Sequence, residues 1–260
     1  MQALLNTAVK AARKGGETAL RHLNRVHQLK IRAKSQNEFV TKVDLMAEEA
    51  IIETIRERYP DHAFLAEESG LHGDGDFVWI IDPLDGTTNF IHGFPVFAVS
   101  IALRVKGRLQ VGVIYDPNRQ EIFTAMRGQG AQVDGHRIRV SGRLELEGAL
   151  IGTGFPYRNL EHLDQYLGML KDVLRHTAGI RRPGAAALDL AYVATGRLDG
   201  FWEFGLKEWD IAAGSLLIRE AGGLISELQG DGDYLKSGNV VAGGPKVHDA
   251  LKKLLSSHLL

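Results

Sequence analysis

The feature that most constrains this chain is an apolar run that ends abruptly in the motif Asp-Pro-Leu-Asp-Gly-Thr-Thr at residues 82–88. The run itself, residues 77–81, is β-branched or aromatic and predicts a buried strand. The proline of the motif has no N–H and its glycine tolerates a positive φ, so the strand is expected to stop and the backbone to turn here. The result is a rigid corner that carries Asp82 and Asp85.

Two carboxylates at one corner need a partner of opposite charge. They project into one small volume, where like charges about 4 Å apart repel by roughly 4 kcal/mol at an effective dielectric constant of about 20. Carboxylate oxygens, together with a carbonyl oxygen that the turn frees, here that of Leu84, are hard ligands that suit Mg²⁺ better than Zn²⁺. The motif therefore predicts a magnesium site.

Composition limits the class of protein. With 260 residues and 44% hydrophobic content, the chain can bury a large core, as one domain or as two closely fused halves. Its net charge of −1 gives no global basic field, so we find no direct nucleic-acid signal and expect no binding to an anionic membrane. The absence of cysteine excludes disulfides and thiolate metal sites and fits a reducing compartment, so a cytoplasmic protein is expected.

Hydrophobic periodicity predicts the order of helices and strands. The first helix, over residues 2–26, is amphipathic and lacks the pattern of a signal peptide, and no apolar run approaches the roughly 18 residues of a membrane span. The rest of the first half predicts a loop at 34–44, a helix at 44–59, a strand at 64–66, a surface loop at 69–76, a hairpin of 96–105 with 108–115, and strands at 121–125, 131–133 and 137–140.

The second half alternates the two kinds of element. Strands are predicted from 150 and at 200–203, 224–227 and 240–241, with helices at 160–176, 186–194, 211–221 and 247–255. The fold class is therefore α+β, an antiparallel sheet half followed by a mixed α/β half. We treat residues 1–260 as one unit with tentative halves 1–145 (metal-binding) and 146–260.

A second motif, Trp209-Asp210-Ile-Ala-Ala-Gly, opens an apolar helical stretch. It places the Asp210 carboxylate at a helix N-terminus, where the macrodipole favours negative charge. Taken alone, an ordinary N-cap aspartate is the simpler interpretation.

The two motifs, with Glu67-Glu68-Ser69 upstream, resemble the signatures of the inositol monophosphatase family, in order and spacing over nearly the whole chain. Residues 181–192, Arg-Arg-Pro-Gly-Ala-Ala-Ala-Leu-Asp-Leu-Ala-Tyr, look most like the bacterial SuhB-like branch. The resemblance implies a layered αβαβα sandwich of the sugar and inositol phosphatase type and a lithium-sensitive hydrolase. It also implies a homodimer, with residues 155–156 and 181–183 as candidate contacts.

The resemblance implies a set of metal ligands, which makes Asp210 a ligand and not only a cap. One Mg²⁺ would be held by Glu67, Asp82 and the Leu84 carbonyl, and a second by Asp82, Asp85 and Asp210. Two such ions about 3.5–4 Å apart stabilise both the attacking and the leaving oxygen of an in-line displacement. A third ion stays open, because glutamate replaces the family's commoner aspartate at position 38.

For catalysis, the resemblance implies attack by a metal-activated water that Thr87 and Asp44 position and that Glu67 helps to activate. Judged only from the sequence around them, Thr87 and Asp44 are equally well explained as caps of their own helices. The implied substrate-binding residues are Asp85, Gly86, Thr87, Ala186, Glu203 and Asp210, with Lys34 on a loop near the phosphate.

For the implied substrate-binding residues, the sequence alone leaves simpler interpretations open. Backbone N–H groups of Gly86 and Thr87 suit a phosphate oxygen, although an Asp-Gly-Thr turn is common. Glu203 is equally well a surface glutamate, Ala186 a good helix former, and Lys34 a solvated loop lysine.

The leading hypothesis is an enzyme that hydrolyses inositol-1-phosphate to inositol and phosphate. Fructose-1,6-bisphosphatase, histidinol-phosphatase and nucleotide 3′-phosphatase relatives share the metal motif, and the match at Glu203 favours inositol phosphate over them. An alternative of another class is a SuhB-type factor for transcription antitermination or ribosomal RNA processing, which binds the transcription machinery.

Overall fold

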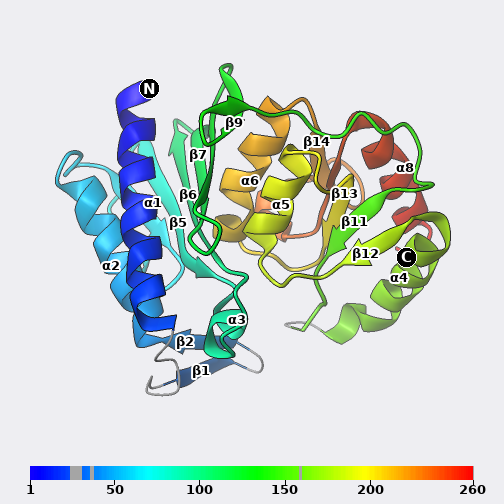
Figure 1. Ribbon diagram of the computed structural model, residues 1–260, viewed down its shortest axis with the longest axis horizontal. Helices are drawn as coiled ribbons and strands as arrows, with labels where there is room; N and C mark the ends of the chain where they lie inside the picture. Colours follow the sequence, from blue (N-terminus) through cyan, green and yellow to red (C-terminus); the bar gives the residue numbers. More distant parts are fainter. Residues whose placement is uncertain (24–30, 36–37, 158–159, 260) are drawn as a thin grey trace.

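A computed structural model describes residues 1–23, 31–35, 38–157 and 160–259, without the side chains of 31–35 and 38–40 (Figure 1). The helices are α1 (Gln2–Leu23), α2 (Lys42–Arg56), α3 (Thr87–Ile91), α4 (Leu163–His176), α5 (Ala186–Ala194), α6 (Glu208–Glu220), α7 (Tyr234–Ser237), α8 (Pro245–Ser256) and a 3₁₀ helix (Leu160–His162). Among the described residues, no helix is long and apolar enough to cross a membrane.

The strands are β1 (Ile31–Ser35), β2 (Glu38–Thr41), β3 (Ala63–Ala66), β4 (Gly70–His72), β5 (Phe77–Asp85), β6 (Ala98–Val105), β7 (Arg108–Asp116), β8 (Glu121–Met126), β9 (Gly130–Val133), β10 (His136–Arg137), β11 (Leu150–Thr153), β12 (Gly179–Arg181), β13 (Gly200–Glu203), β14 (Leu224–Glu227) and β15 (Val240–Gly243). Within the described residues, β3–β10 form an eight-stranded sheet in the order β10-β9-β8-β7-β6-β5-β3-β4. A second sheet has five strands in the order β12-β11-β13-β15-β14.

The two sheets differ in strand direction. Neighbours in the first sheet are antiparallel, except that β3 and β5 run parallel. In the second sheet β12, β11 and β13 are parallel, and β15 pairs antiparallel with both β13 and β14. The predicted succession of an antiparallel half and a mixed half is confirmed.

The elements stack in five layers, which run from left to right in Figure 1. Helices α1 and α2 cover the outer face of the first sheet, and α4 and α8 cover the outer face of the second. Helices α5 and α6 lie between the sheets. The predicted αβαβα sandwich is therefore confirmed.

The middle layer explains why α5 is apolar on all sides. Its sequence, Ala-Ala-Leu-Asp-Leu-Ala-Tyr-Val-Ala, is buried at every residue except Tyr192, because the helix contacts a sheet on either side. One apolar cluster consequently joins Ile114 of the first sheet to Phe201 of the second. Close approach of α6 depends on Gly112 of β7, where a Cβ would lie 2.9 Å from the Ala213 carbonyl oxygen.

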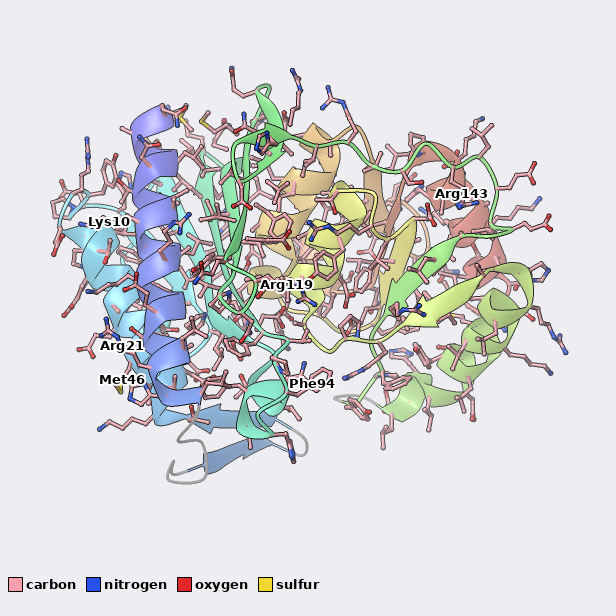
Figure 2. The ribbon with its side chains drawn as sticks, in the orientation of Figure 1. Lys10, Arg21, Met46, Phe94, Arg119 and Arg143 are labelled. Carbon is pink, nitrogen blue, oxygen red and sulfur yellow. The ribbon has the colours of Figure 1, made fainter. Side chains whose placement is uncertain are left out.

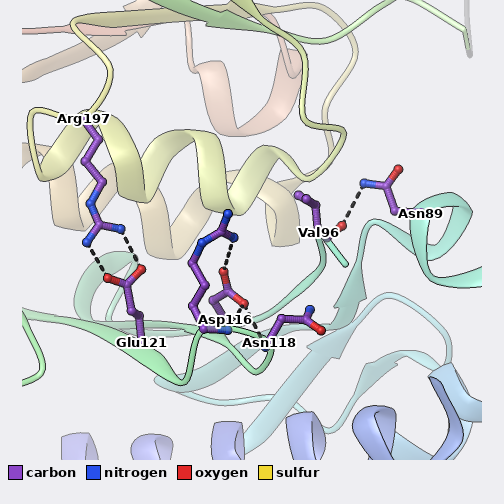
Figure 3. A network of polar contacts seen from close by, with 7 residues as sticks. Asn89, Val96, Asp116, Asn118, Glu121 and Arg197 are labelled. Atoms are coloured by element: carbon purple, nitrogen blue, oxygen red, sulfur yellow. Dashed lines mark hydrogen bonds and ion pairs between the residues drawn. The ribbon is translucent and has the colours of Figure 1, made fainter. Parts of the chain in front are cut away.

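Polar contacts also tie the sheets to one another. Arg197, just after α5, makes a two-pronged ion pair with Glu121 of β8, and so links the middle layer to the first sheet (Figure 3). The segment that crosses from the first sheet to the second carries Arg143 (Figure 2), whose Nε lies 3.3 Å from Asp199 Oδ2. The same oxygen accepts a hydrogen bond of 2.7 Å from the Leu150 N–H. We therefore propose one unit over 1–260, with 1–145 and 146–260 as subdivisions.

Several predicted boundaries are wrong. The strand predicted to end at residue 81 continues to Asp85, because the turn is an irregularity in the register of β5 between Asp82 and Asp85. Within the loop predicted at 34–44, the structure has the end of β1, the whole of β2 and the start of α2. Strands β4 and β12, with three residues each, are too short to show a period of two in the sequence. The strand predicted at 137–140 shrinks to β10, and residues 24–26 of the predicted first helix lie outside the described residues.

Candidate active site

The corner at the end of β5 is built as the sequence requires. Asp82 is buried, and its Oδ1 accepts a hydrogen bond of 2.9 Å from the Leu84 N–H, which fixes the carboxylate inside the turn. Gly86 follows with φ of +94°, in the left-handed region. A Cβ there would lie 2.9 Å from the Val96 carbonyl oxygen, so both conformation and space demand glycine.

Asp210 reaches the same corner from the opposite direction. It is the third residue of α6, and its Oδ2 accepts a hydrogen bond of 2.8 Å from the Lys207 N–H, so it does help to cap its helix. It also lies with Asp82 and Asp85, whose ligand atoms are all within 4.8 Å of one another. The helix-capping contact and the place in the acidic cluster therefore belong to one side chain.

The electrostatics of this cluster call for a cation. Burial raises the pKa of the Asp82 carboxyl well above its ordinary value, and the neighbouring carboxylates of Glu67, Asp85 and Asp210 raise it further. The donor set consists of carboxylate oxygens, with the Leu84 carbonyl beside them in the same cavity. Such hard oxygen ligands fit a divalent cation of the Mg²⁺ type. The cluster is thus an acidic site able to bind metal.

Thr87 connects the corner to α2, far away in the sequence. Its Oγ1 lies 2.9 Å from Asp44 Oδ1 and 3.1 Å from the Leu84 carbonyl oxygen, so its single proton has two acceptors within reach, of which Asp44 is the nearer. Asp44 is fully buried, and its Oδ2 accepts hydrogen bonds from the N–H (2.8 Å) and the hydroxyl (2.6 Å) of Thr41. Burial raises the pKa of Asp44, and the hydrogen bonds from Thr41 and Thr87 oppose that rise. Asp44 therefore caps α2 and positions the Thr87 hydroxyl at once.

A cavity of about 600 Å³ opens beside the acidic cluster. The predicted site residues that line it are Glu67, Asp82, Leu84, Asp85, Gly86, Thr87, Ala186, Glu203 and Asp210. Asp44 touches the cavity through Thr87, and the side chain of Lys34 lies outside the described residues. The structure thus brings the predicted residues together from β5, α3, α5, β13 and α6, with Glu67 directly after β3 and Gly86 between β5 and α3.

Hydrogen bonds between side chains and the backbone fix the walls of the cavity relative to one another. The Ala187 N–H donates a hydrogen bond of 2.7 Å to Asp85 Oδ2, which fixes the start of α5 against the acidic corner. Asn89 Nδ2 donates to the carbonyl oxygens of Val96 at 2.8 Å (Figure 3) and Pro183 at 2.9 Å. The segment before α5 is thereby held against the loop that follows α3.

Sequence reasoning did not assign several polar residues that line the cavity to the site, among them Thr153, Arg182 (considered only as a dimer contact) and Asp189. Asp189 is 1% exposed, and its Oδ1 has no hydrogen-bond partner among the described residues. Burial raises its pKa well above the ordinary value, the carboxylates of Glu203 and Asp85 raise it further, and Arg182 opposes the rise. The available signal was an acid within an otherwise apolar helix.

Together the fold and the site define a class of protein: α+β hydrolases of the sugar and inositol phosphatase type, in which a buried strand and a middle-layer helix assemble a carboxylate metal site. Residues 1–259 match the model of the Inositol monophosphatase family, and the chain belongs to this family. The predicted family membership is confirmed.

Relatives place the chain beside the SuhB branch. It is 54% identical over 265 residues to a Pseudomonas aeruginosa protein named Nus factor SuhB, with 100% of this chain and 98% of that relative covered. The crystal structure of extragenic suppressor protein suhB from Bartonella henselae matches with a TM-score of 0.95 and 45% identity, over 97% of this chain and 98% of that one. An IMPase of Thermotoga maritima matches with a TM-score of 0.90 and 34% identity, over 100% and 98% of the two chains.

Proposed function

We propose that this protein is a Mg²⁺-dependent phosphomonoesterase that hydrolyses inositol-1-phosphate to inositol and inorganic phosphate. The observation that carries the proposal is the hydrogen bond from Thr87 to Asp44, at the edge of a cavity whose floor is the carboxylate cluster. A hydroxyl oriented by a buried acid beside a cation site suits the positioning of a water for attack.

The metal ligands that we propose are Glu67, Asp82 and the Leu84 carbonyl for one ion, and Asp82, Asp85 and Asp210 for another. Bound Mg²⁺ would supply Lewis-acid stabilisation of charge on the phosphoryl oxygens and would lower the pKa of a coordinated water. A third ion remains a separate question for metal titration.

The protein's own groups would guide the reaction. With its proton donated to Asp44, the Thr87 hydroxyl turns its lone pairs toward the water and accepts a hydrogen bond from it. As the water oxygen forms its bond to phosphorus and the ester P–O bond breaks, the Glu67 carboxylate takes the water's proton. The departing inositol oxygen gains a proton from solvent, and Glu67 then returns its proton to solvent, so charge and atoms balance.

Binding of substrate follows from the walls of the cavity. The N–H groups of Gly86 and Thr87, on the left-handed turn, would hold a phosphate oxygen. Glu203 would accept hydrogen bonds from the inositol hydroxyls, and the small Ala186 leaves room for the ring. Asp85 and Asp210, which belong to the carboxylate cluster and line the cavity, would also contact the bound substrate.

A panel assay tests this function. Release of phosphate from inositol-1-phosphate, fructose 1,6-bisphosphate, histidinol phosphate and a nucleotide 3′-phosphate is measured with Mg²⁺ and again in chelator. We expect inositol-1-phosphate to have the highest kcat/KM and chelator to abolish turnover. A higher kcat/KM for another compound would make that compound the assigned substrate. Full turnover in chelator would contradict the metal-dependent mechanism.

A second candidate function is supported by the name Nus factor SuhB of the Pseudomonas aeruginosa relative, which is 54% identical over the whole chain. We propose that the protein also contacts the transcription machinery, in the cytoplasm expected from its sequence. Purified transcription factors are tested for binding to the wild type and to a catalytically inactive Asp82→Asn variant. Equal binding by both proteins would establish a binding surface that does not depend on catalysis. If neither protein bound, this second function would be contradicted.

A further inference from the structure

Asp189 is a buried acid that the mechanism above does not use. It is the fourth residue of α5, it is 1% exposed, and it lines the cavity. Its Oδ1 has no hydrogen-bond partner among the described residues. The oxygen lies against Gly152 of β11, where even a Cβ would come within 3.2 Å of it.

A buried carboxyl with one oxygen that lacks a hydrogen-bond partner reduces the stability of a fold, so its presence in the core requires an explanation. Here the cost is compounded, because the carboxylates of Glu203 and Asp85 lie near enough to raise the pKa of Asp189 further. An alanine or leucine would continue the apolar pattern of α5 without that cost. Because Asp189 lines the cavity, its placement favours a role toward a ligand bound there.

The chemistry of that partner follows from the neighbouring residues. Glu203, Asp189 and Thr153 all line the cavity, and the charge of Glu203 acts on the Asp189 carboxyl. Two acids would repel a second phosphate or a carboxylate held against them. Hydroxyl groups suit them in either protonation state, because a hydroxyl both donates and accepts hydrogen bonds.

We propose that Asp189 is a specificity-determining residue that, with Glu203, hydrogen-bonds the hydroxyl groups of a neutral polyol phosphate, directly or through one bridging water. The inference rests on the proposed phosphatase function and extends it to the part of the substrate that is remote from the phosphorus. Asp189 thus contributes to the choice of substrate, and Thr87 with the acidic corner contributes to the chemistry.

Substitutions at Asp189 test the proposal on two substrates. Asp189→Leu removes both oxygens, and Asp189→Asn keeps the shape and the capacity to hydrogen-bond. With inositol-1-phosphate, we expect Asp189→Leu to raise KM about tenfold, the effect of losing one hydrogen bond, with kcat within about twofold of the wild type. Asp189→Asn should restore most of that loss. With p-nitrophenyl phosphate, which has no hydroxyl groups, both variants should match the wild type.

Tyr192→Phe is the matched control, because Tyr192 also has a buried, unpartnered oxygen on α5 but does not line the cavity. It should leave both substrates unchanged. Thermal melting distinguishes a structural role of Asp189 from a role in substrate binding. If the role were structural, both Asp189 variants would have a lower melting temperature, and KM would rise equally for both substrates. That result, or an unchanged KM for inositol-1-phosphate in an active Asp189→Leu protein, overturns the proposal alone. A wild type that hydrolyses no phosphomonoester overturns the proposed function as well.

Discussion

The Ala187 N–H donates a hydrogen bond of 2.7 Å to Asp85 Oδ2, across 102 residues of sequence. It joins a helix of the middle layer to the acidic corner of the first sheet. Because Ala186 and Asp189 lie on the same helix, the part of the cavity wall that α5 forms is fixed relative to the proposed metal ligands. The hydrogen bond therefore couples the proposed ring-binding part of the site to the proposed catalytic part.

Asp82→Asn is expected to abolish turnover without unfolding the protein. The change removes a charged ligand, and it also relieves repulsion from Glu67, Asp85 and Asp210 in the metal-free state. The melting temperature in chelator should be equal to the wild-type value or higher. Full turnover by the variant would contradict the proposed metal site.

The stability of the metal-free protein should fall as pH rises. The pKa of Asp82 is raised in the folded state, so above its ordinary value of 3.8 the folded protein keeps a proton that the unfolded chain has lost. Unfolding then releases protons, and the free energy of unfolding decreases with pH until Asp82 ionises in the folded state as well. Asp44 and Asp189, whose pKa values are also raised, act in the same direction.

Melting in chelator between pH 4 and pH 8, with Asp82→Asn beside the wild type, checks the sign. We expect the variant to lose less stability than the wild type over this range. Asp74→Asn, at an exposed position in the loop before β5, is the control and should follow the wild type. Identical curves for Asp82→Asn and the wild type would show that Asp82 carries no such penalty.

Thr87→Ala and Asp44→Asn should each lower kcat by about 100-fold. The first change removes the hydroxyl that positions the water, and the second removes the carboxylate that orients this hydroxyl. Since the two side chains act through one hydrogen bond, the double variant should be little worse than either single variant. Additive losses would mean that the residues act independently. Asp44→Asn should also lower the melting temperature, because Asp44 accepts the hydrogen bonds from Thr41 at the start of α2.

Lithium should inhibit the enzyme uncompetitively with respect to substrate. Its radius is close to that of Mg²⁺ and its charge is half as large, so at the site formed by Asp82, Asp85 and Asp210 it would bind without supporting turnover. Sodium and potassium should be much weaker, and Asp210→Glu should blunt the effect by changing the size of the site. Unaltered turnover in lithium at saturating substrate would mean that this site is built differently.

The protein is expected to be a homodimer, with the segments at 155–156 and 181–183 contributing to the contact. The Arg182 guanidinium lies over the rings of Phe155 and Tyr157, 5.1 and 5.2 Å from their centroids, and holds a surface of exposed aromatic rings. Arg182→Ala should lower the dimer fraction in sedimentation velocity at micromolar concentration, and the exposed Arg58→Ala should not. A purely monomeric wild type would contradict the expectation.

The acidic corner could be predicted because its signal is local. A strand pattern that ends in Asp-Pro-Leu-Asp-Gly places Asp82 and Asp85 together within a few residues. The apolar helix after Asp210 indicates only a helix cap, and its place at the corner was inferred through the resemblance to a family. The contact of Thr87 with Asp44 spans 43 residues, so it could be inferred only through the resemblance to a family.

Other features had at most a weak local signal. Asp189 stands out as an acid within an otherwise apolar helix, but only the packing of α5 between two sheets shows that it is buried. At the turn inside β5, pairing with β6 continues on both sides, with Asp82 opposite Ser100 and Asp85 opposite Ala98. This shift of register interrupts the period of two, so hydrophobic periodicity could not predict it.

The shared middle layer has a consequence for the synthesis of the protein on the ribosome. The first sheet is complete at Arg137, but the helix that covers much of its inner face, α6, ends only at Glu220. At roughly 5–20 residues per second, the ribosome needs about 4–17 s to add the intervening segment. During that interval the nascent sheet presents an apolar face that includes Ile80 and Ile114, and a chaperone that shields it should increase the yield of folded protein.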